Sequence, residues 1–255
     1  MLFGFGRMRA DSVVALFALE ADMKVLRSIG TEVAEPRPWY GGKLYFIQLG
    51  RHQVRATLMQ SGCIESSITA ATLLSRERPD WLISVGVAGS LNDSHPRGTW
   101  LGVGELTSNG SMQPAGATPV EKLAIAGDDP ALRSALPDVW KGTASVRLLS
   151  VGRFVHNDSE REGLRGESGA DLVDMNLLGI VRACQRAGVK SLHWRIVSDW
   201  ANVEAGRDFR EFVVKYDGVG GRALAEFVKA LPVSRERPEA YPQLDKLIQS
   251  IEVKP

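Results

Sequence analysis

The segment that decides the fold is Trp194-Arg195-Ile196-Val197-Ser198-Asp199. Its β-branched residues Ile196 and Val197 are typical of a strand inside a sheet. A carboxylate is costly to bury without a partner, so we expect Asp199 at the end of this strand. In open α/β folds, that edge of the sheet is where ligands bind. The local alternative is that Ser198 or Asp199 only caps the next helix.

Strand-like and helical patterns alternate along the rest of the chain. Apolar, strand-like runs predict strands at 13–18, 43–49, 52–59, 81–86, 145–151 and 191–197. Apolar residues at helical spacing predict helices at 22–29, 64–76, 177–187, 209–216 and 222–231. Gly50-Arg51 separates two of these strands, which predicts an antiparallel hairpin. The order predicts a single α/β domain around a mixed sheet.

Two regions do not follow this alternation. Residues 92–117 are rich in Gly, Ser and Pro, which predicts a long loop around one short strand near Glu105. Residues 232–255 combine a Pro- and charge-rich linker with a short helical pattern. We expect the domain to occupy 1–231 and this tail to be a peripheral appendage.

Composition excludes several classes of function. The chain has 255 residues, 44% apolar and 24% charged, as in ordinary globular proteins. Its 31 Lys and Arg nearly balance its 30 Asp and Glu, so no net field would attract nucleic acid or an anionic membrane. Two cysteines and four scattered histidines form no disulfide framework and no metal motif. We expect no metal and no cofactor.

The N-terminus also argues against a membrane segment. Arg7 and Arg9 precede an apolar run at 13–19, which Glu20 and Asp22 end too early for a membrane-spanning helix. No small-residue cleavage site follows this run. We therefore expect a cytoplasmic protein without a membrane partner.

Two glycine-containing segments are candidates for ligand contact. Gly86-Val87-Ala88-Gly89-Ser90 follows a strand, and its glycines allow a ligand to approach the backbone, although a tight turn explains them equally well. Ser61-Gly62-Cys63-Ile64 opens a helix whose first amides can hold an anion or a hydroxyl. Cys63 is either a nucleophile at that helix start or, as we favour, a small buried residue.

Two further segments place polar side chains where a strand becomes a helix. Leu19-Glu20-Ala21-Asp22 has acids in a first helical turn, which the helix dipole favours without any function. Asp174-Met175-Asn176 also starts a helix, and Asn176 has the residue type of an N-cap. Neither segment indicates a function by itself.

Taken together and in order, four of these segments resemble the purine nucleoside phosphorylase/uridine phosphorylase superfamily. The resemblance is closest to its methylthioadenosine/S-adenosylhomocysteine nucleosidases. Residues 18–22 resemble Ala-Met-Glu-Glu-Glu, 85–91 Thr-Gly-Ser-Ala-Gly-Gly-Leu, 173–176 Val-Glu-Met-Glu and 195–199 Arg-Ala-Ile-Ser-Asp. The likeness covers roughly 13 to 231. It implies a single-domain, three-layer αβα fold with a central mixed sheet and assembly into a homo-oligomer, a dimer or larger.

The resemblance implies a base-binding half of a site. Cleavage of an N-glycosidic bond needs a proton for the departing purine. Asp199 would hydrogen-bond the purine and act as the general acid, and Ser198 would orient its carboxylate. Phe154 matches the aromatic residue that stacks on the base, and the backbone of Val155 would contact the edge of the base.

The resemblance also implies where the rest of a small-molecule nucleoside would bind. Met175 would pack on the ribose, with the glycine turn at Val87, Ala88 and Gly89 beside it. The pocket for the 5′ substituent would be lined by Leu19, Cys63 and Phe209. Arg195 and Asp22 would hold or activate the nucleophilic water.

Three departures from the family pattern fall on the ribose and water side. Asn176 replaces the glutamate that binds ribose hydroxyls, so it can hydrogen-bond but carries no charge. Asp22 is shorter than the family glutamate by one carbon, and productive geometry is sensitive to such a change. Val87 replaces a serine and offers no hydrogen bond. The base-binding half has no such change.

Hydrolysis is favoured over phosphorolysis. Phosphorylases of the superfamily carry an arginine just before the glycine turn, where this chain has Ser84. Without such cations a phosphate dianion lacks charge-assisted hydrogen bonds, although Arg51 on the hairpin turn is placed to serve a neighbouring subunit. The leading hypothesis is a nucleosidase for a purine nucleoside with a modified 5′ position, and adenine is the favoured base. A phosphorylase that uses phosphate as co-substrate and a catalytically silent nucleoside-binding protein are the alternatives.

Overall fold

A computed structural model describes residues 11–40, 42–108, 120–124 and 129–232. Its strands are β1 (Ser12–Phe17), β2 (Thr31–Trp39), β3 (Gly42–Leu49), β4 (His52–Leu58), β5 (Trp81–Ser90), β6 (Trp100–Ser108), β7 (Glu121–Lys122), β8 (Ser145–Ser150), β9 (Leu172–Asp174) and β10 (Lys190–Asp199). Its helices are α1 (Glu20–Ile29), α2 (Cys63–Glu77), α3 (Pro130–Ala135), α4 (Asp158–Ser168), α5 (Leu177–Ala187), α6 (Ala205–Lys215) and α7 (Val219–Ala230). The expected tail helix lies outside the described residues.

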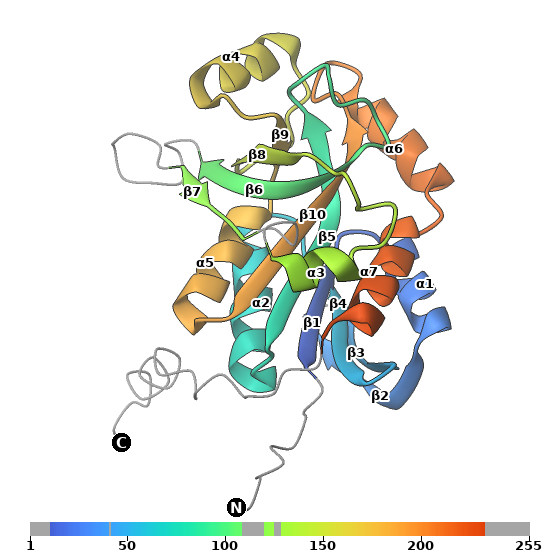
Figure 1. The fold of residues 1–255 in the computed structure, drawn as a ribbon. Coiled ribbons are helices and arrows are strands. Elements are labelled where there is room, and N and C mark those ends of the chain that lie inside the picture. Colours follow the sequence, from blue (N-terminus) through green and yellow to red (C-terminus); the bar gives the residue numbers. More distant parts are fainter. Residues whose placement is uncertain (1–10, 41, 109–119, 125–128, 233–255) are drawn as a thin grey trace, which may run out of the picture.

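All ten strands belong to one mixed sheet, as predicted, in the order β10-β6-β8-β9-β5-β1-β4-β3-β2, with β7 beside β6. β5 has three neighbours, because it pairs with β1 and β10 along its length and with β9 at its end. The strands β10, β6, β8, β9 and β5 therefore close a ring at one side of the sheet (Figure 1). The carboxyl ends of β5 and β10 meet in this ring.

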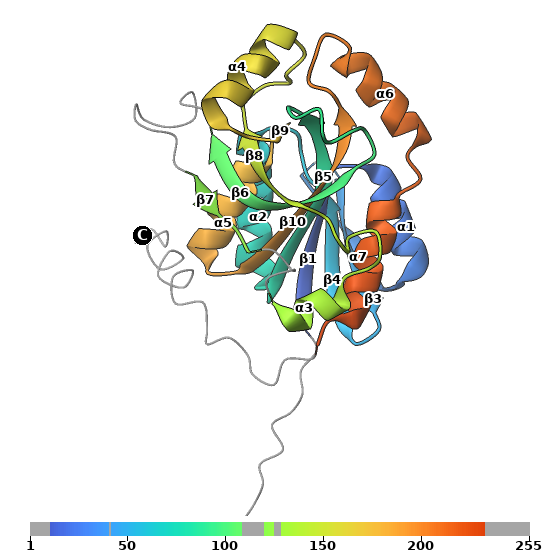
Figure 2. The same ribbon diagram turned by 45° about the horizontal axis from the view of Figure 1, so that its top comes forward.

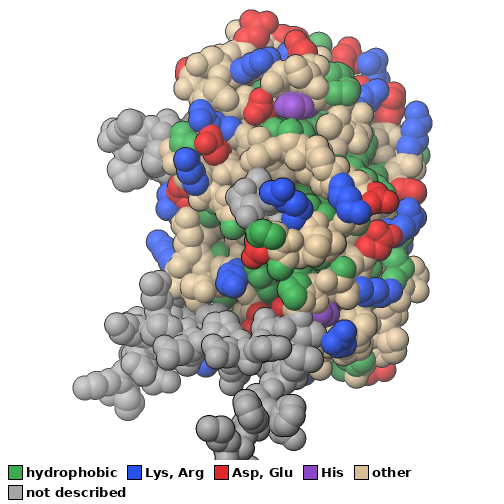
Figure 3. All heavy atoms as spheres, in the orientation of Figure 1, with side chains coloured by type: hydrophobic (Ala, Val, Ile, Leu, Met, Phe, Trp, Pro, Cys, Tyr) green, Lys and Arg blue, Asp and Glu red, His purple; other side chains and the backbone are tan. Residues whose placement is uncertain are grey.

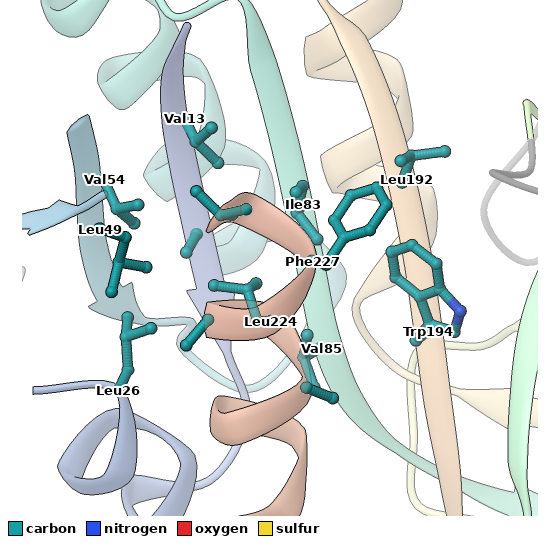
Figure 4. Close-up of a cluster of buried hydrophobic side chains, with 14 of the residues drawn as sticks. Val13, Leu26, Leu49, Val54, Ile83, Val85, Leu192, Trp194, Leu224 and Phe227 are labelled. Atoms are coloured by element: carbon teal, nitrogen blue, oxygen red, sulfur yellow. The ribbon is translucent and has the colours of Figure 1, made fainter. Parts of the chain in front are cut away.

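Helices cover both faces of the sheet because the strands are apolar on both. Along β1, Val13, Ala15 and Phe17 face one cluster of buried side chains, and Val14 and Leu16 face another. The first cluster includes residues of α1 and α7, and the second includes residues of α2 and α5. Figure 4 shows Leu224 and Phe227 of α7 among the strand side chains of the first cluster. The three-layer α/β fold is confirmed.

The helices α2 and α5 pack unusually closely against each other. A Cβ atom on Gly179 of α5 would lie 2.3 Å from the carbonyl oxygen of Cys63 and 2.3 Å from Oγ of Ser67. Only glycine allows this approach, since real side chains do not come so near to backbone atoms. The contact brings the beginnings of α2 and α5 together, next to the carboxyl end of β9.

The sequence patterns missed four elements, of which the two-residue β7 is the shortest. β2 is mostly exposed and contains Pro36 and Pro38, which hide a strand pattern and are tolerated at the edge of a sheet. In α4, Leu164 is the one buried residue, so the helix has no apolar stripe to recognise. The six-residue α3 was not predicted either, and its Asp129 cap is its clearest local signal.

Several predicted boundaries need correction. The strand expected near Glu105 extends over all of β6, because β8 and β10 pair with its two edges. α6 begins at Ala205 and not at Phe209. Residues 86–90 are the continuation of β5 and not a tight turn. The hairpin of β3 and β4 around Gly50-Arg51 is confirmed.

The surface agrees with the charge balance of the sequence. Figure 3 shows acidic and basic side chains interspersed over one face. None of the helices in the described ranges is long and apolar enough to cross a membrane. Within the same ranges, no group of three or more His, Cys, Asp or Glu is arranged to hold a metal ion.

Candidate active site

A cavity of about 440 Å³ opens at the carboxyl ends of β5, β9 and β10. Figures 1 and 2 show α4 and α6 above these strand ends. The cavity is lined by Ser61, Val87, Ala88, Gly89, Arg153, Phe154, Val155, Val173, Asp174, Met175, Asn176, Ser198, Asp199, Gly206, Phe209 and Arg210. Ten of the fourteen residues predicted for the site are in this lining.

Asp199 reaches the cavity because β10 is irregular at its end. Val197 pairs with Ala88 of β5, and Asp199 pairs with the very next residue, Gly89, so Ser198 is an extra residue in a bulge. A bulge re-aims the side chains that follow it. A Cβ atom on Gly89 would lie 2.9 Å from Oδ1 of Asp199, so glycine leaves room for the carboxylate.

The surroundings of Asp199 favour its protonated form. The residue is only 2% exposed, and this burial is the main cause that raises the pKa of its carboxyl group. The hydroxyl of Ser198 donates to Oδ2 at 2.8 Å, and the amide of Ala201 donates to Oδ1 at 2.9 Å. Both hydrogen bonds oppose the rise without cancelling it. A raised pKa is the direction of shift that a carboxyl group needs to act as a general acid.

The capping alternative for this segment is wrong. The N-cap position of α6 is Glu204, five residues after Asp199, and the Asp199 carboxylate accepts only the nearby Ala201 amide from the backbone. Ala201 itself has a positive φ of 53°, which is uncommon for a residue with a side chain. The loop after β10 is therefore held in a specific shape around the carboxylate.

One wall of the cavity is aromatic. The rings of Phe154 and Phe209 meet edge to face, with centroids 6.3 Å apart. Phe154 is 41% exposed, which is unusual for a large apolar side chain and leaves ring surface available to a planar ligand. Val155, the next residue, is buried and fixes this loop in the core.

A buried ion pair lies behind the cavity. Nη2 and Nε of Arg195 donate to Oδ2 of Asp174 at 2.9 and 3.1 Å, and Nη1 donates to Oγ of Ser84 at 3.1 Å. Asp174 also accepts hydrogen bonds from Ser150 and from the first amides of α5, including that of Leu177. Asp174 lines the cavity and Arg195 does not. The ion pair fixes the start of α5, from which Met175 and Asn176 project.

Asn176 is at the N-cap position of α5, but its side chain does not cap that helix. Its Oδ1 accepts the amide of Gly62 at 2.8 Å, and its Nδ2 donates to the sulfur of Met59 at 3.4 Å. The capping acceptor is Asp174. In the described ranges only one of the two amide hydrogens of Asn176 has a partner, so the other is free for a ligand hydroxyl.

Four of the predicted residues are not in the lining. Besides Arg195, these are Leu19, Asp22 and Cys63. Asp22 is 1% exposed, and its Oδ1 accepts hydrogen bonds from the hydroxyl of Tyr216 at 2.7 Å and from the amide of Gly221 at 2.8 Å. The carboxylate thus joins α1 to α7, and burial raises its pKa to about 6.

Leu19 and Cys63, the other two predicted residues outside the lining, also belong to the scaffold of the fold. Leu19 precedes the first residue of α1. Burial raises the pKa of the Cys63 thiol, which disfavours the thiolate that a nucleophile requires. Ser67 donates a hydrogen bond to the carbonyl oxygen of Cys63, so the residue is part of the α2 scaffold.

Sequence reasoning missed six residues of the lining, which are Ser61, Arg153, Val173, Asp174, Gly206 and Arg210. Three of them, Arg153, Asp174 and Arg210, directly adjoin a predicted residue along the chain, and this adjacency was the available signal. Gly206, Phe209 and Arg210 follow helical spacing from one face of α6, which a helix starting at 209 concealed.

Comparisons with known proteins show the family to which the chain belongs. Residues 12–231 match the family model described as the phosphorylase superfamily. The chain is 26% identical over 223 residues to 5′-methylthioadenosine/S-adenosylhomocysteine nucleosidase of Staphylococcus carnosus, which covers 84% of this chain and 97% of that protein. The Staphylococcus aureus nucleosidase is 26% identical over 207 residues, covering 78% of this chain and 90% of that protein.

Solved structures show the same fold. Futalosine hydrolase of Helicobacter pylori has a TM-score of 0.76 at 18% identity, covering 87% of this chain and 99% of that chain. A Neisseria meningitidis 5′-methylthioadenosine/S-adenosylhomocysteine nucleosidase in complex with methylthio-immucillin-A has a TM-score of 0.75 at 20% identity, covering 87% and 100%. The predicted family is confirmed: this chain belongs to the phosphorylase superfamily.

Proposed function

We propose that the protein is a nucleosidase that hydrolyses the N-glycosidic bond of a purine nucleoside with a modified 5′ position. The observation that carries the proposal is Asp199, a buried carboxyl group with a raised pKa in the lining of a cavity with an aromatic wall. Relatives named as 5′-methylthioadenosine/S-adenosylhomocysteine nucleosidases support an adenine nucleoside as the substrate.

Asp199 would supply the proton for the leaving base. Cleavage passes through a state in which the ribose carries positive charge and the base negative charge, so protonating the base lowers the barrier. Ser198 donates to the carboxyl oxygen Oδ2 and thereby fixes its orientation. The exposed ring of Phe154 offers a face on which the base can stack. The backbone of Val155, the next residue in the lining, would contact the edge of the base.

The ribose would bind at the start of α5. Met175 offers apolar surface there, and Asn176 keeps one amide hydrogen for a ribose hydroxyl. Val87, Ala88 and Gly89 form the adjoining part of the lining. Phe209 would contact the 5′ substituent.

Water is the proposed nucleophile, because a positively charged ribose needs little help to capture it. Asp22 and Arg195 lie outside the lining, so we propose that they support the fold around the site and do not contact this water. Ser84, at the position of the phosphorylase arginine, is buried and hydrogen-bonded to His193 and Arg195, and it offers no cation to a phosphate.

Phosphorolysis is the second candidate, and Arg210 favours it, because this cation in the lining has no carboxylate partner within the described ranges. The two reactions differ in one measurable requirement. A nucleosidase releases base at the same rate with and without inorganic phosphate, whereas a phosphorylase needs it.

The test is release of free base from methylthioadenosine, S-adenosylhomocysteine, adenosine and inosine, each with and without phosphate. We expect phosphate-independent release of adenine, and an Asp199→Asn protein that is folded but at least about a hundredfold slower, as is typical when a general acid is removed. The matched control is Asp158→Asn, which removes an acid of α4 outside the lining and should leave the rate unchanged.

Three results would contradict the proposal. Release only in the presence of phosphate would establish the phosphorylase. Tight binding of nucleoside without any release would establish a silent binding protein. Full activity of the Asp199→Asn protein would remove Asp199 as the acid. Homo-oligomerisation and a cytoplasmic location stay predictions from the sequence.

A further inference from the structure

Helix α6 carries part of the cavity lining but has little buried surface of its own. Three residues from its first two turns line the cavity, namely Gly206, Phe209 and Arg210. The buried residues of α6 are Ala205 and Asp208, and further along the helix Phe212 packs against the first cluster of buried side chains. Figures 1 and 2 show α6 at the outer edge of the molecule. Apolar packing therefore does little to fix the half of α6 that faces the cavity.

Asp208 is a buried carboxylate whose partner comes from another element. Nη1 of Arg97 lies 3.1 Å from Oδ1 of Asp208 and 3.9 Å from Oε2 of Glu211, one turn later. Arg207 also approaches Asp208, at 4.0 Å, but it belongs to α6 itself and cannot fix the helix to the sheet. The side chain of Asp208 is 8% exposed, so its charge needs a partner. Among the described residues, Arg97 is the cation that supplies this partner from outside the helix.

Arg97 lies on a segment that is hydrogen-bonded to the strand of Asp199. The amide of Gly98 donates to the carbonyl oxygen of Val197 at 2.8 Å, and the amide of Val197 donates to the carbonyl oxygen of Thr99 at 3.0 Å. These bonds continue the pairing of β6 with β10 to within two residues of Asp199. The ion pair therefore joins the cavity half of α6 to the strand end that carries the proposed acid.

We propose that Arg97 is a positioning residue, which holds the cavity half of α6 at a fixed distance from the end of β10. Through Asp208 it fixes the next residue, Phe209, and so the width of the cavity between Phe209 and Asp199. This inference rests on the proposed function, in which Asp199 takes the base and Phe209 contacts the 5′ substituent. The alternative is that Asp208 only favours the start of α6, where the helix dipole stabilises an acid.

Hydrogen exchange tests the positioning without any turnover. Removing the guanidinium leaves the buried Asp208 without its partner, so the cavity half of α6 should open more often. In Arg97→Met we expect the amides of residues 205–215 to exchange at least about tenfold faster, as measured by mass spectrometry of peptides. Arg97→Lys should restore part of the protection, because the charge remains. The matched control Arg55→Met breaks a partly buried ion pair with Glu77, away from the cavity lining, and should leave the exchange of α6 unchanged.

A double-mutant cycle assigns the effect to the ion pair. Asp208→Asn removes the charge of the partner and should also raise the exchange of α6. The double variant should exchange no faster than the faster single variant, because both changes remove the same interaction. Additive effects would show that Arg97 and Asp208 act separately, and they would overturn the inference.

Kinetics place the effect on the 5′ side of the site. The substrate is 5′-methylthioadenosine, and the reference ligand is adenine, which has no 5′ arm. For Arg97→Met we expect KM about tenfold higher and kcat within about threefold of wild type, since Asp199 and Phe154 keep their places. The inhibition constant of adenine should stay within about twofold of wild type. A purely structural loss would instead lower the amount of active enzyme, and so the apparent kcat, while KM stayed the same.

The outcomes separate this inference from the proposed function. Equal exchange of α6 in Arg97→Met and wild type would overturn the inference, whether or not the protein releases base. Faster exchange with an unchanged KM would overturn the link between Arg97 and the 5′ side of the site. If no variant released base, the nucleosidase would be contradicted, and the exchange of α6 would still decide whether Arg97 positions the helix.

Discussion

Replacing Asp22 by asparagine separates a catalytic from a structural role for this carboxylate. The wild-type side chain is buried between α1 and α7, where Tyr216 and Gly221 donate to its Oδ1. Asparagine has the same shape and can accept both hydrogen bonds through its own Oδ1, but it cannot ionise. The substitution Asp22→Asn therefore removes the charge and keeps the contacts.

The magnitude follows from the shift in pKa. Burial raises the pKa of Asp22 from 3.8 to about 6, so ionisation costs the folded state about 3 kcal/mol more than the unfolded state. The pKa of Asp22 is higher in the folded state than in the unfolded state, so the protonated side chain favours folding. This contribution to the free energy of unfolding is complete only below the unfolded pKa. This contribution is lost as the pH rises from about 4 to about 6, and above that range the whole cost is present.

We expect the Asp22→Asn protein to gain free energy of unfolding relative to wild type as the pH rises. The difference in free energy of unfolding between the variant and the wild type should increase by about 2 kcal/mol from about pH 4 to about pH 7.5. Urea denaturation of both proteins, followed by tryptophan fluorescence, measures it at each pH. A difference that does not change with pH would refute the reasoning.

The same variant tests catalysis. Since Asp22 is outside the cavity lining, base release by Asp22→Asn should stay within about threefold of wild type. A residue that activates the nucleophile typically contributes about a hundredfold or more. A loss of that size in a folded and stabilised protein would return Asp22 to the water-activating role that the family resemblance implies.

Three further outcomes follow from the geometry. As a general acid with a raised pKa, Asp199 should make kcat/KM fall as the pH rises above that pKa, and a flat profile from about pH 5 to about pH 9 would contradict the assignment. Gly179→Ala places a methyl group 2.3 Å from the carbonyl oxygen of Cys63, so urea denaturation should show a loss of about 1–3 kcal/mol; an unchanged midpoint would show that α2 and α5 separate easily. Arg195→Met leaves Asp174 buried without its partner and should cost about 3–5 kcal/mol of stability, whereas a neutral effect would mean that the buried pair contributes nothing net.

The position of Asp199 and Phe154 in the cavity lining was predictable because its signals are local. β10 carries the β-branched Ile196 and Val197 and ends in Asp199, and the aromatic Phe154 lies in the loop that follows β8. A strand that ends in a carboxylate places it at the sheet edge whatever the rest of the chain does. Only the bulge at Ser198, which depends on pairing with β5, was not visible in the sequence.

The surroundings of Asp22 and Arg195 could not be predicted, because they depend on partners far away in the chain. Asp22 meets Tyr216 and Gly221, about two hundred residues later, and these contacts take its carboxylate away from the cavity. Arg195 likewise pairs with Asp174. A motif gives the residue type at a position but not the direction in which a side chain points, which tertiary packing decides.

The hydrogen bond from Gly62 to Asn176 couples the cavity wall to the helix behind it. Position 176 holds the first turn of α2 as well as facing the cavity, and its amide also contacts Met59. A glutamate at this position would place a new charge beside a thioether sulfur. Residues 59, 62 and 176 therefore form one packing unit, and a substitution at 176 that reshapes the cavity also disturbs the start of α2.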